Sequence, residues 1–284
     1  MYIALAIIAV VVLLAVVHSY TAKNYLGQNV PFYSGNFAIE SPQSAEHLTV
    51  ISYNISYGRN IEQALHEIRK FTSQKTPDIL LLQEMDETGT EKFGHELQLN
   101  YVYYPAAVEP KYKRNFGNAV LSRWPIVESQ KLILPHISLS DRMKRVATRA
   151  TIRIQDIDVI AYSIHTEPVF ILPKFKENQC FAILEDTGSQ ARVVIVGGDF
   201  NAFTEAYAEK LEKRFSRAGF VRASKGSGYT FVRFGFKMPP DQILTKGFVV
   251  KSAGKFAEAK ASDHLPVWVI LRPENGYKIN DDSD

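Results

Sequence analysis

Carboxylate and amide side chains stand directly after three apolar runs of the sequence. The runs are 50–53, 80–82 and 194–198, and the residues that follow them are Asn54, Gln83 with Glu84, and Asp199 with Asn201. A single Asn or Asp after a strand is usually a turn former. Repetition of the pattern predicts instead that these side chains meet at one rim of a sheet. Such oxygen donors suit Mg²⁺, and the lack of a Cys/His cluster with ligand spacing disfavours zinc.

Five short motifs occur in a fixed order along the chain. They are Tyr-Asn-Ile at 53–55, Leu-Gln-Glu at 82–84, Gly-Asn-Ala-Val-Leu-Ser-Arg at 117–123, Gly-Asp-Phe-Asn at 198–201 and Ser-Asp-His-Leu-Pro-Val at 262–267. One tetrapeptide would be a weak signal, whereas five in order are specific. From about Leu48 to Leu271 the chain resembles the endonuclease/exonuclease/phosphatase superfamily, also called DNase I-like. The resemblance implies hydrolysis of a phosphoric ester bond.

The resemblance also implies a metal site for Mg²⁺, with Mn²⁺ as a substitute. The positions that serve the metal in the family are matched here by Asn54, Glu84 and Asp263. Mg²⁺ is typically held by one or two carboxylates while it bridges to a phosphate, which agrees with these residue types. We therefore expect a metal-dependent phosphodiesterase or nuclease.

The catalytic residues that the resemblance implies are His264, Asp241, Asp199, Asn201 and His165. A carboxylate at Asp241 would fix the tautomer of the His264 imidazole, whose other nitrogen would assist attack of water on phosphorus. Asp199 would position that water, and Asn201 would donate to a non-bridging oxygen. His165 matches a histidine of the DNase I and sphingomyelinase branches, which contacts the phosphate or protonates the leaving oxygen. No Ser or Cys nucleophile motif is present, so direct in-line attack by water is expected.

Short strands that alternate with amphipathic helices must position these residues, which predicts α/β layering. Strands are expected at 48–53, 79–82, 148–155, 158–164, 193–196, 229–231, 243–245 and 267–271, and helices after a capping Asn60, over 175–185 and over 207–218. The strands at 148–155 and 158–164 would form a hairpin. With the resemblance, this pattern predicts a four-layer sandwich of two mixed β-sheets flanked by helices.

The 284 residues, 46% of them hydrophobic, suit one domain over 48–272. Residues 1–22 are expected to be an N-terminal transmembrane anchor or a signal segment, 23–47 a linker, and 273–284 a flexible tail. The uncharged run 2–17 is longer than the apolar part of a typical signal peptide, about 7–15 residues, and slightly shorter than a spanning helix of about 20. His18 and Tyr20 interrupt the nearest small-x-small candidates for a cleavage site. This favours a single-pass membrane protein, with secretion or periplasmic release after cleavage as the alternative.

The substrate class stays open between a lipid head group and DNA or RNA. The apolar N-terminal segment would hold the site near a bilayer, whereas basic residues between the motifs suit nucleic acid: Lys111, Lys113, Arg114, Arg142, Lys144 and Arg145. Both substrates carry phosphate, and a net charge of +3 is too small to indicate a nucleic-acid binder.

A non-catalytic binding module is disfavoured because every motif residue is present. The lone Cys180 is expected to pack in the core, and no protein partner can be inferred.

Overall fold

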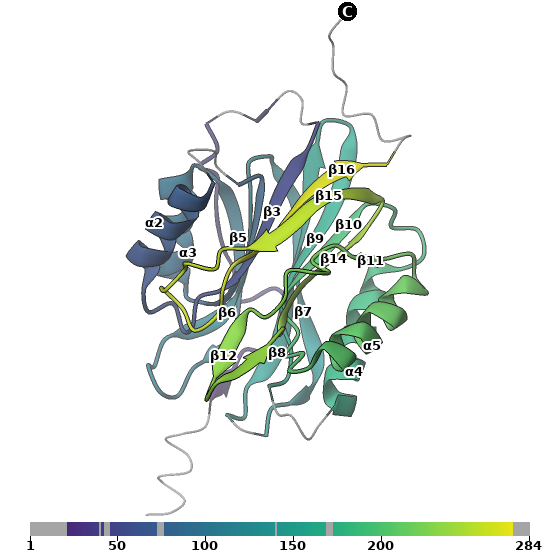
Figure 1. The fold of residues 1–284 in the computed structure, drawn as a ribbon. Coiled ribbons are helices and arrows are strands. Elements are labelled where there is room, and N and C mark those ends of the chain that lie inside the picture. The colour runs from purple at the N-terminus through teal and green to yellow at the C-terminus, as the bar shows by residue number, and fades with distance from the viewer. Residues whose placement is uncertain are drawn as a thin grey trace, which may run out of the picture.

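The computed structural model describes residues 22–39, 41–42, 46–72, 77–139, 141–168 and 173–274. Two mixed β-sheets pack face to face, and two helices cover the outer face of each sheet (Figure 1). Helices α2 and α3 lie on one side of Figure 1, and α4 and α5 lie on the other. This is the four-layer sandwich expected from the sequence.

The first sheet brings the first and last strands of the predicted domain together. Its order is β1-β5-β6-β4-β3-β16-β15, and β2 also pairs with β5. The bounds are β1 Lys23–Asn24, β2 Tyr33–Gly35, β3 Leu48–Asn54, β4 Ile79–Met85, β5 Asn100–Val108, β6 Asn115–Ser122, β15 Phe248–Lys255 and β16 Val267–Pro273. Strands β3 and β4 run parallel, so their carboxyl ends, which carry Asn54 and Glu84, meet at one edge.

The second sheet lines up three of the predicted site residues in one row. Its order is β11-β14-β10-β9-β8-β7, with β7 Ile126–Ile137, β8 Lys144–Ile154, β9 Ile157–His165, β10 Val194–Asp199, β11 Val221–Arg222 and β14 Asp241–Lys246. Asp199 pairs with His165 on one side and with Asp241 on the other. The expected hairpin is present as the antiparallel pair β8 and β9. A separate two-stranded hairpin consists of β12 Phe231–Arg233 and β13 Phe236–Met238.

The helices are α2 Ile61–Phe71, α3 Glu87–Leu97, α4 Pro173–Thr187 and α5 Glu205–Ser216. Helix α2 buries Ala64, Leu65 and Ile68 on one face, as the spacing of its apolar residues predicts. Asn60 occupies the N-cap position, but its side chain makes no capping bond and donates instead to the carbonyl of Ala261 at 2.8 Å. The predicted cap is therefore wrong in its bonding, because the amide reaches a more distant segment.

Apolar side chains fill three layers, one between the sheets and one under each helix pair. Cys180 of α4 is buried in the core, as expected. A small polar group lies in the interior below the site: Gln83 donates to the hydroxyl of Ser163 at 2.9 Å, and Ser163 donates to the carbonyl of Leu82 at 2.8 Å. These bonds join the first sheet to the second. Buried polar groups of this kind are stable only when they are hydrogen-bonded, so they fix the relative position of the sheets.

The segment 23–47, expected to be a linker, carries β1 and β2, which pair with β5. Strands of two or three residues are too short to show periodicity, so the sequence pattern gives no sign of them. The predicted anchor or signal segment lies outside the described residues apart from Ala22, and most of the predicted tail, 275–284, also lies outside them. None of the helices in the described ranges is long and apolar enough to cross a membrane.

Candidate active site

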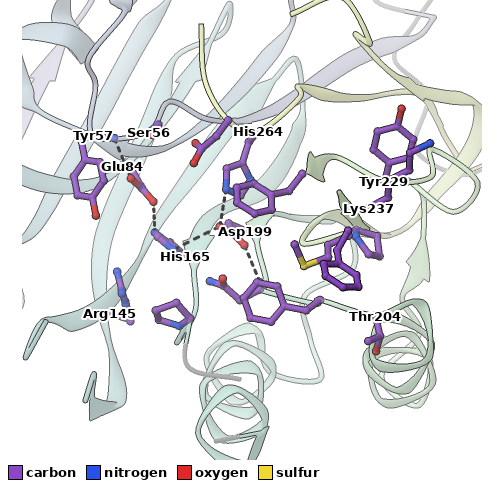
Figure 2. Close-up of a pocket in the computed structure, with 18 of the residues that line it drawn as sticks. Ser56, Tyr57, Glu84, Arg145, His165, Asp199, Thr204, Tyr229, Lys237 and His264 are labelled. Atoms are coloured by element: carbon purple, nitrogen blue, oxygen red, sulfur yellow. Dashed lines mark hydrogen bonds and ion pairs between the residues drawn. The ribbon is translucent and has the colours of Figure 1, made fainter. Parts of the chain in front are cut away.

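The predicted catalytic residues, with Asn54 and Glu84, converge at one end of the two sheets, around a cavity of about 1190 Å³. Asn54 and Glu84 come from the first sheet, and His165, Asp199 and Asp241 come from the second. His264 precedes β16 and reaches the same place (Figure 2). We call this space the active-site cavity; its walls include Glu84, Arg145, His165, Asp199 and His264. Because both sheets contribute, the interface between the sheets determines the geometry of the site.

Asp199 is the centre of the cluster. Its carboxylate is 2% exposed and accepts from the Asn54 amide at 3.1 Å and from the backbone N–H of Asn201 at 2.7 Å. The Nε2 atoms of His165 and His264 lie 3.6 and 3.7 Å from its Oδ2 atom. The carboxylate therefore lies between two imidazoles, as the dashed lines in Figure 2 show.

Glu84 projects toward the cavity because the chain leaves regular strand geometry at this residue. The pairing of β4 with β6 shifts register between Leu82 and Met85, and Glu84 has a φ of 58°. Its carboxylate accepts from the backbone N–H of Tyr57 at 2.9 Å and from the Asn54 amide at 3.1 Å. Burial raises the pKa of Glu84 to about 7. A nearby positive charge would stabilise the ionised form of this largely buried carboxylate.

His264 and Asp241 form the pair that the resemblance implies. Nδ1 of His264 lies 2.9 Å from Oδ2 of Asp241, and the Thr230 hydroxyl donates to the same oxygen at 2.6 Å. Burial opposes protonation of His264, but the carboxylates of Asp241 and Asp199 outweigh it and raise the pKa of His264 to about 10. In the absence of another cation, the ring therefore carries a proton at neutral pH.

His165, in contrast to His264, is neutral. Burial, reinforced by the positive charge of Arg145, lowers the pKa of His165 to about 3. Within the described part of the chain, its Nδ1 atom has no hydrogen-bond partner, and it lies 3.9 Å from Oε1 of Glu84. A neutral imidazole can donate one hydrogen bond, so the geometry favours contact with a phosphoryl oxygen over protonation of a leaving group.

The two other predicted metal positions differ in how they present their oxygens. The amide oxygen of Asn54 accepts from the backbone N–H of Ser56 at 3.0 Å, so its amide nitrogen faces the carboxylates of Glu84 and Asp199. Asn54 thus orients the two carboxylates. Asp263 is exposed and lines the cavity, where its charge helps to raise the pKa of His264.

The donor set fits a hard divalent cation. Ligand atoms of Asp199, Asp241 and His264 lie within 4.8 Å of one another, but Asp241 and His264 already bond to each other. Glu84 and Asp199 are joined through Asn54 and keep acceptor capacity, because an ionised carboxylate offers about four lone-pair sites. Two acidic side chains with oxygen donors only are typical of Mg²⁺ sites.

Arg145 belongs to this site, although the sequence analysis placed it only among basic residues between motifs. Arg145 is 3% exposed and lines the cavity, and one of its guanidinium nitrogens donates to the Asp141 carboxylate at 3.1 Å. Within the described ranges, no acceptor pairs with Nε or Nη1. Arg145 is the second residue of β8 and lies three residues before the predicted strand start at 148, so its inward position was not foreseen. A buried guanidinium with open donors suits an anion.

Lys176 is a second residue that the sequence analysis did not identify, and it contacts the backbone of Asn201. Lys176 of α4 is buried and donates to the backbone carbonyl of Asn201 at 2.9 Å. Asn201 has a φ of 48°, and its amide donates to the carbonyl of Thr166 at 3.0 Å. These two bonds hold Asn201 in the left-handed conformation that turns its side chain toward the cavity. A lone Lys within a helix carries no sequence signal for this role.

Replacing Arg145 with methionine is expected to weaken binding of inorganic phosphate by about tenfold or more, because hydrogen bonds to charged groups contribute about 1.5–3 kcal/mol. The free energy of unfolding should stay the same or rise, since a buried charge with open donors is lost. Thermal shift in a phosphate titration measures both quantities. The exposed Arg142 provides the matched variant, Arg142→Met, which should bind phosphate normally. Equal affinities for the two variants would remove Arg145 from the anion site.

Comparison with known proteins gives a consistent result. The model of the Endonuclease/Exonuclease/phosphatase family matches residues 51–264. A UPF0294 protein of Vibrio cholerae serotype O1 is 27% identical over 134 residues, 46% of each chain, so the match spans about half the length of this relative. An endonuclease/exonuclease/phosphatase from Beutenbergia cavernae has a TM-score of 0.65 at 18% identity, covering 81% of this chain and 72% of that chain. D. rerio TDP2, complexed with a single strand DNA product, has a TM-score of 0.62 at 15% identity, covering 80% and 100%.

Proposed function

Because the chain belongs to the endonuclease/exonuclease/phosphatase family, whose members hydrolyse phosphoester bonds, we propose that it is a Mg²⁺-dependent phosphodiesterase that uses direct attack by water. The observation that carries the proposal is the meeting of Glu84, Asp199 and the Asp241–His264 pair in one cavity. A binding module that had lost its catalytic activity would not need all of these side chains. Their presence in one cavity, contributed by both sheets, therefore argues against such a module.

In this proposal Glu84 holds the metal ion, Asp263 approaches it from the rim, and Asn54 orients Glu84 and Asp199. When bound, the ion would neutralise these carboxylates and stabilise charge on the phosphoryl oxygens. These four residues come from the two sheets and from the segment before β16. Mn²⁺, which accepts the same donors, is expected to substitute.

Asp199 positions the attacking water, and His264 exchanges a proton with it. Asp241 accepts from Nδ1 of His264, so Nε2 is the atom that faces Asp199 and the cavity. A bound cation would offset the carboxylate charge that keeps His264 protonated. Nε2 of the neutral ring would then take up a proton from water and return it to the leaving oxygen. Thr230 donates to Asp241 and keeps this carboxylate in place. Arg145, His165 and Asn201 supply hydrogen-bond donors toward the phosphate from the opposite wall.

The apolar run before residue 22 supports a protein tethered to a membrane by an N-terminal anchor, or one that is secreted or periplasmic after cleavage of a signal. The second candidate function is an endonuclease or exonuclease on DNA or RNA. It is favoured by the likeness to TDP2, whose structure holds a single strand DNA product, and by exposed cations such as Lys111 and Arg142 near the cavity.

Glu84→Gln tests the metal site. The variant is expected to lose roughly 10²-fold or more of its rate, because it removes a charge worth several kcal/mol to a bound cation while it keeps the side-chain shape. Its melting temperature without metal should not fall, because the raised pKa of Glu84 shows that its negative charge destabilises the folded state, and glutamine removes this charge.

The measurement is a Mg²⁺ titration that follows both rate and melting temperature. Wild-type protein should melt at higher temperature as Mg²⁺ is added, and Glu84→Gln should show a much smaller rise. Glu128→Gln on the half-buried strand β7 is the control and should behave as wild type. A normal rate for Glu84→Gln at limiting Mg²⁺ would remove Glu84 from the metal site.

A further inference from the structure

The β12–β13 hairpin extends from the wall of the active-site cavity and exposes large apolar side chains. Phe234 is 87% exposed, Phe236 is 73% exposed and Val232 is 48% exposed. Phe234 is the most exposed large hydrophobic residue in the described ranges. Isolated exposed apolar residues are ordinary, but several together on one short hairpin indicate an interaction surface.

Turn chemistry does not account for Phe234. Phe234 and Gly235 connect β12 and β13 with φ values of 51° and 81°, so both residues are left-handed. A two-residue turn of this kind favours Asn-Gly or Gly-Gly, and a bulky residue in the first position is strained. The strained backbone and the 87% exposure of Phe234 mark the hairpin tip as a candidate interaction surface.

The base of the hairpin contacts the proposed catalytic residues. The ring of Phe231 lies 4.7 Å from that of His264, centroid to centroid, and the two residues form an isolated β-bridge. Thr230, next to Phe231, donates to Asp241. Lys237 and Met238 of β13 line the cavity. The exposed tip is therefore attached to the wall of the site and lies beside its mouth.

The N-terminal end of the described chain reaches another part of the same rim. Ala22 packs with Phe116 and Met143, and both of these residues line the cavity. Asn24 donates to the carbonyl of the exposed Arg142 at 2.8 Å. The purple N-terminal end and β12 lie at the same end of the molecule in Figure 1. The uncharged run 2–17 thus precedes a point on the cavity rim by only a few residues.

We propose that the mouth of the active-site cavity faces an anionic lipid bilayer, with the β12–β13 tip in the interface and a lipid-borne phosphate ester as the substrate. The exposed hairpin tip and Ala22, which the apolar run 2–17 precedes in the sequence, both lie at the rim of one cavity, so a membrane bound by the tip and by that run would face the mouth. Lys237, opposite Val232 in the hairpin, and Arg142 supply positive charge for anionic headgroups. The substrate class rests on the proposed phosphodiesterase function, whereas the docking does not.

Tryptophan fluorescence tests the docking in the full chain. Phe234→Trp is mixed with vesicles of phosphatidylcholine and phosphatidylglycerol that carry brominated acyl chains. The emission of the introduced tryptophan is expected to fall, because the bromine atoms quench it on contact. Val127→Trp is the matched control, because Val127 is 51% exposed but lies far from the cavity. It lies at the end of β7 where Ile126 pairs with Ile152, whereas the cavity is at the other end, where Ile137 pairs with Lys144. Its emission should stay unchanged. Subtraction of wild-type emission removes the native Trp124 and Trp268.

Kinetics test the substrate class. The double variant Val232→Ser/Phe234→Ser is expected to hydrolyse a phosphodiester lipid in the same vesicles about tenfold or more slowly, because two apolar side chains no longer enter the bilayer. Its rate on a water-soluble nitrophenyl phosphodiester should match wild type, because neither residue lines the cavity. Val127→Ser should match wild type on both substrates.

The outcomes separate the two proposals. Equal quenching of Phe234→Trp and Val127→Trp, or quenching of neither, overturns the docking. Slower cleavage of a single-stranded oligonucleotide by the double variant, without quenching of Phe234→Trp, also overturns it and assigns the hairpin to nucleic acid. Quenching of Phe234→Trp by a wild-type-like fold that hydrolyses neither diester would refute the proposed function and leave the docking intact.

Discussion

Alanine at position 264 is expected to lower kcat on a phosphodiester by about 10²- to 10⁴-fold, the range in which positioned acid–base groups contribute. Nε2 of His264 faces Asp199 across 3.7 Å, and Asp241 holds the other nitrogen at 2.9 Å. Loss of the ring therefore removes the group that exchanges a proton with water. Steady-state kinetics at saturating Mg²⁺ measure the effect, with the melting temperature as a check on folding.

Two companion variants make this result specific. Asp241→Asn should lose nearly as much rate as His264→Ala, and the double variant should lose little more, because residues that act as a unit are not additive. His165→Ala should lose less, since burial keeps this ring neutral and limits it to one donated hydrogen bond. Additive losses from His264→Ala and Asp241→Asn would show that the two side chains act independently.

Gly198→Ala is expected to have the largest effect on stability. A Cβ atom at Gly198, which has a φ of 151°, would lie 2.0 Å from the carbonyl oxygen of Ile164 on the neighbouring strand β9. Strands β9 and β10 would have to separate, at a cost of about 3 kcal/mol or more. For a domain of this size this lowers the melting temperature by roughly 10 °C. Activity should fall as well, because Asp199 and His165 pair next to this contact.

Gly188→Ala is the control for this substitution. Gly188 also has a positive φ, 67°, but nothing lies within 4 Å of a Cβ built there. Only the conformational cost remains, about 1 kcal/mol. Chemical denaturation of both variants separates steric conflict from backbone preference. Similar losses of stability in the two variants would show that the contact with Ile164 relaxes without cost.

The strands that carry the site could be predicted from sequence because each is an apolar run that ends in a polar residue. Strand β10 is buried at every position, and β4 at every position except Glu84, so these strands read as continuous apolar segments. Strand β5 lacks this signal although it is almost wholly buried. It contains Pro105 beside a register shift, and such a residue argues against a strand in the sequence alone.

The members of the site could be predicted better than their charge states. His165 and His264 each belong to a motif, but nothing near them in the sequence distinguishes a pKa of about 3 from one of about 10. The difference arises from burial and from Arg145 and Asp241, 20 and 23 residues away in the sequence. Such shifts depend on tertiary contacts that no local pattern records.

The position of β16 has a consequence for protein synthesis. This strand lies between β3 and β15, so the strand that opens the predicted domain pairs with one that is translated more than 200 residues later. His264 lies three residues before the start of β16 and needs this strand to reach Asp241. A ribosome-bound chain therefore has no complete proton-transfer pair until β16 has emerged and paired. We therefore expect hydrolysis to begin only after β16 has been translated and has paired with β3.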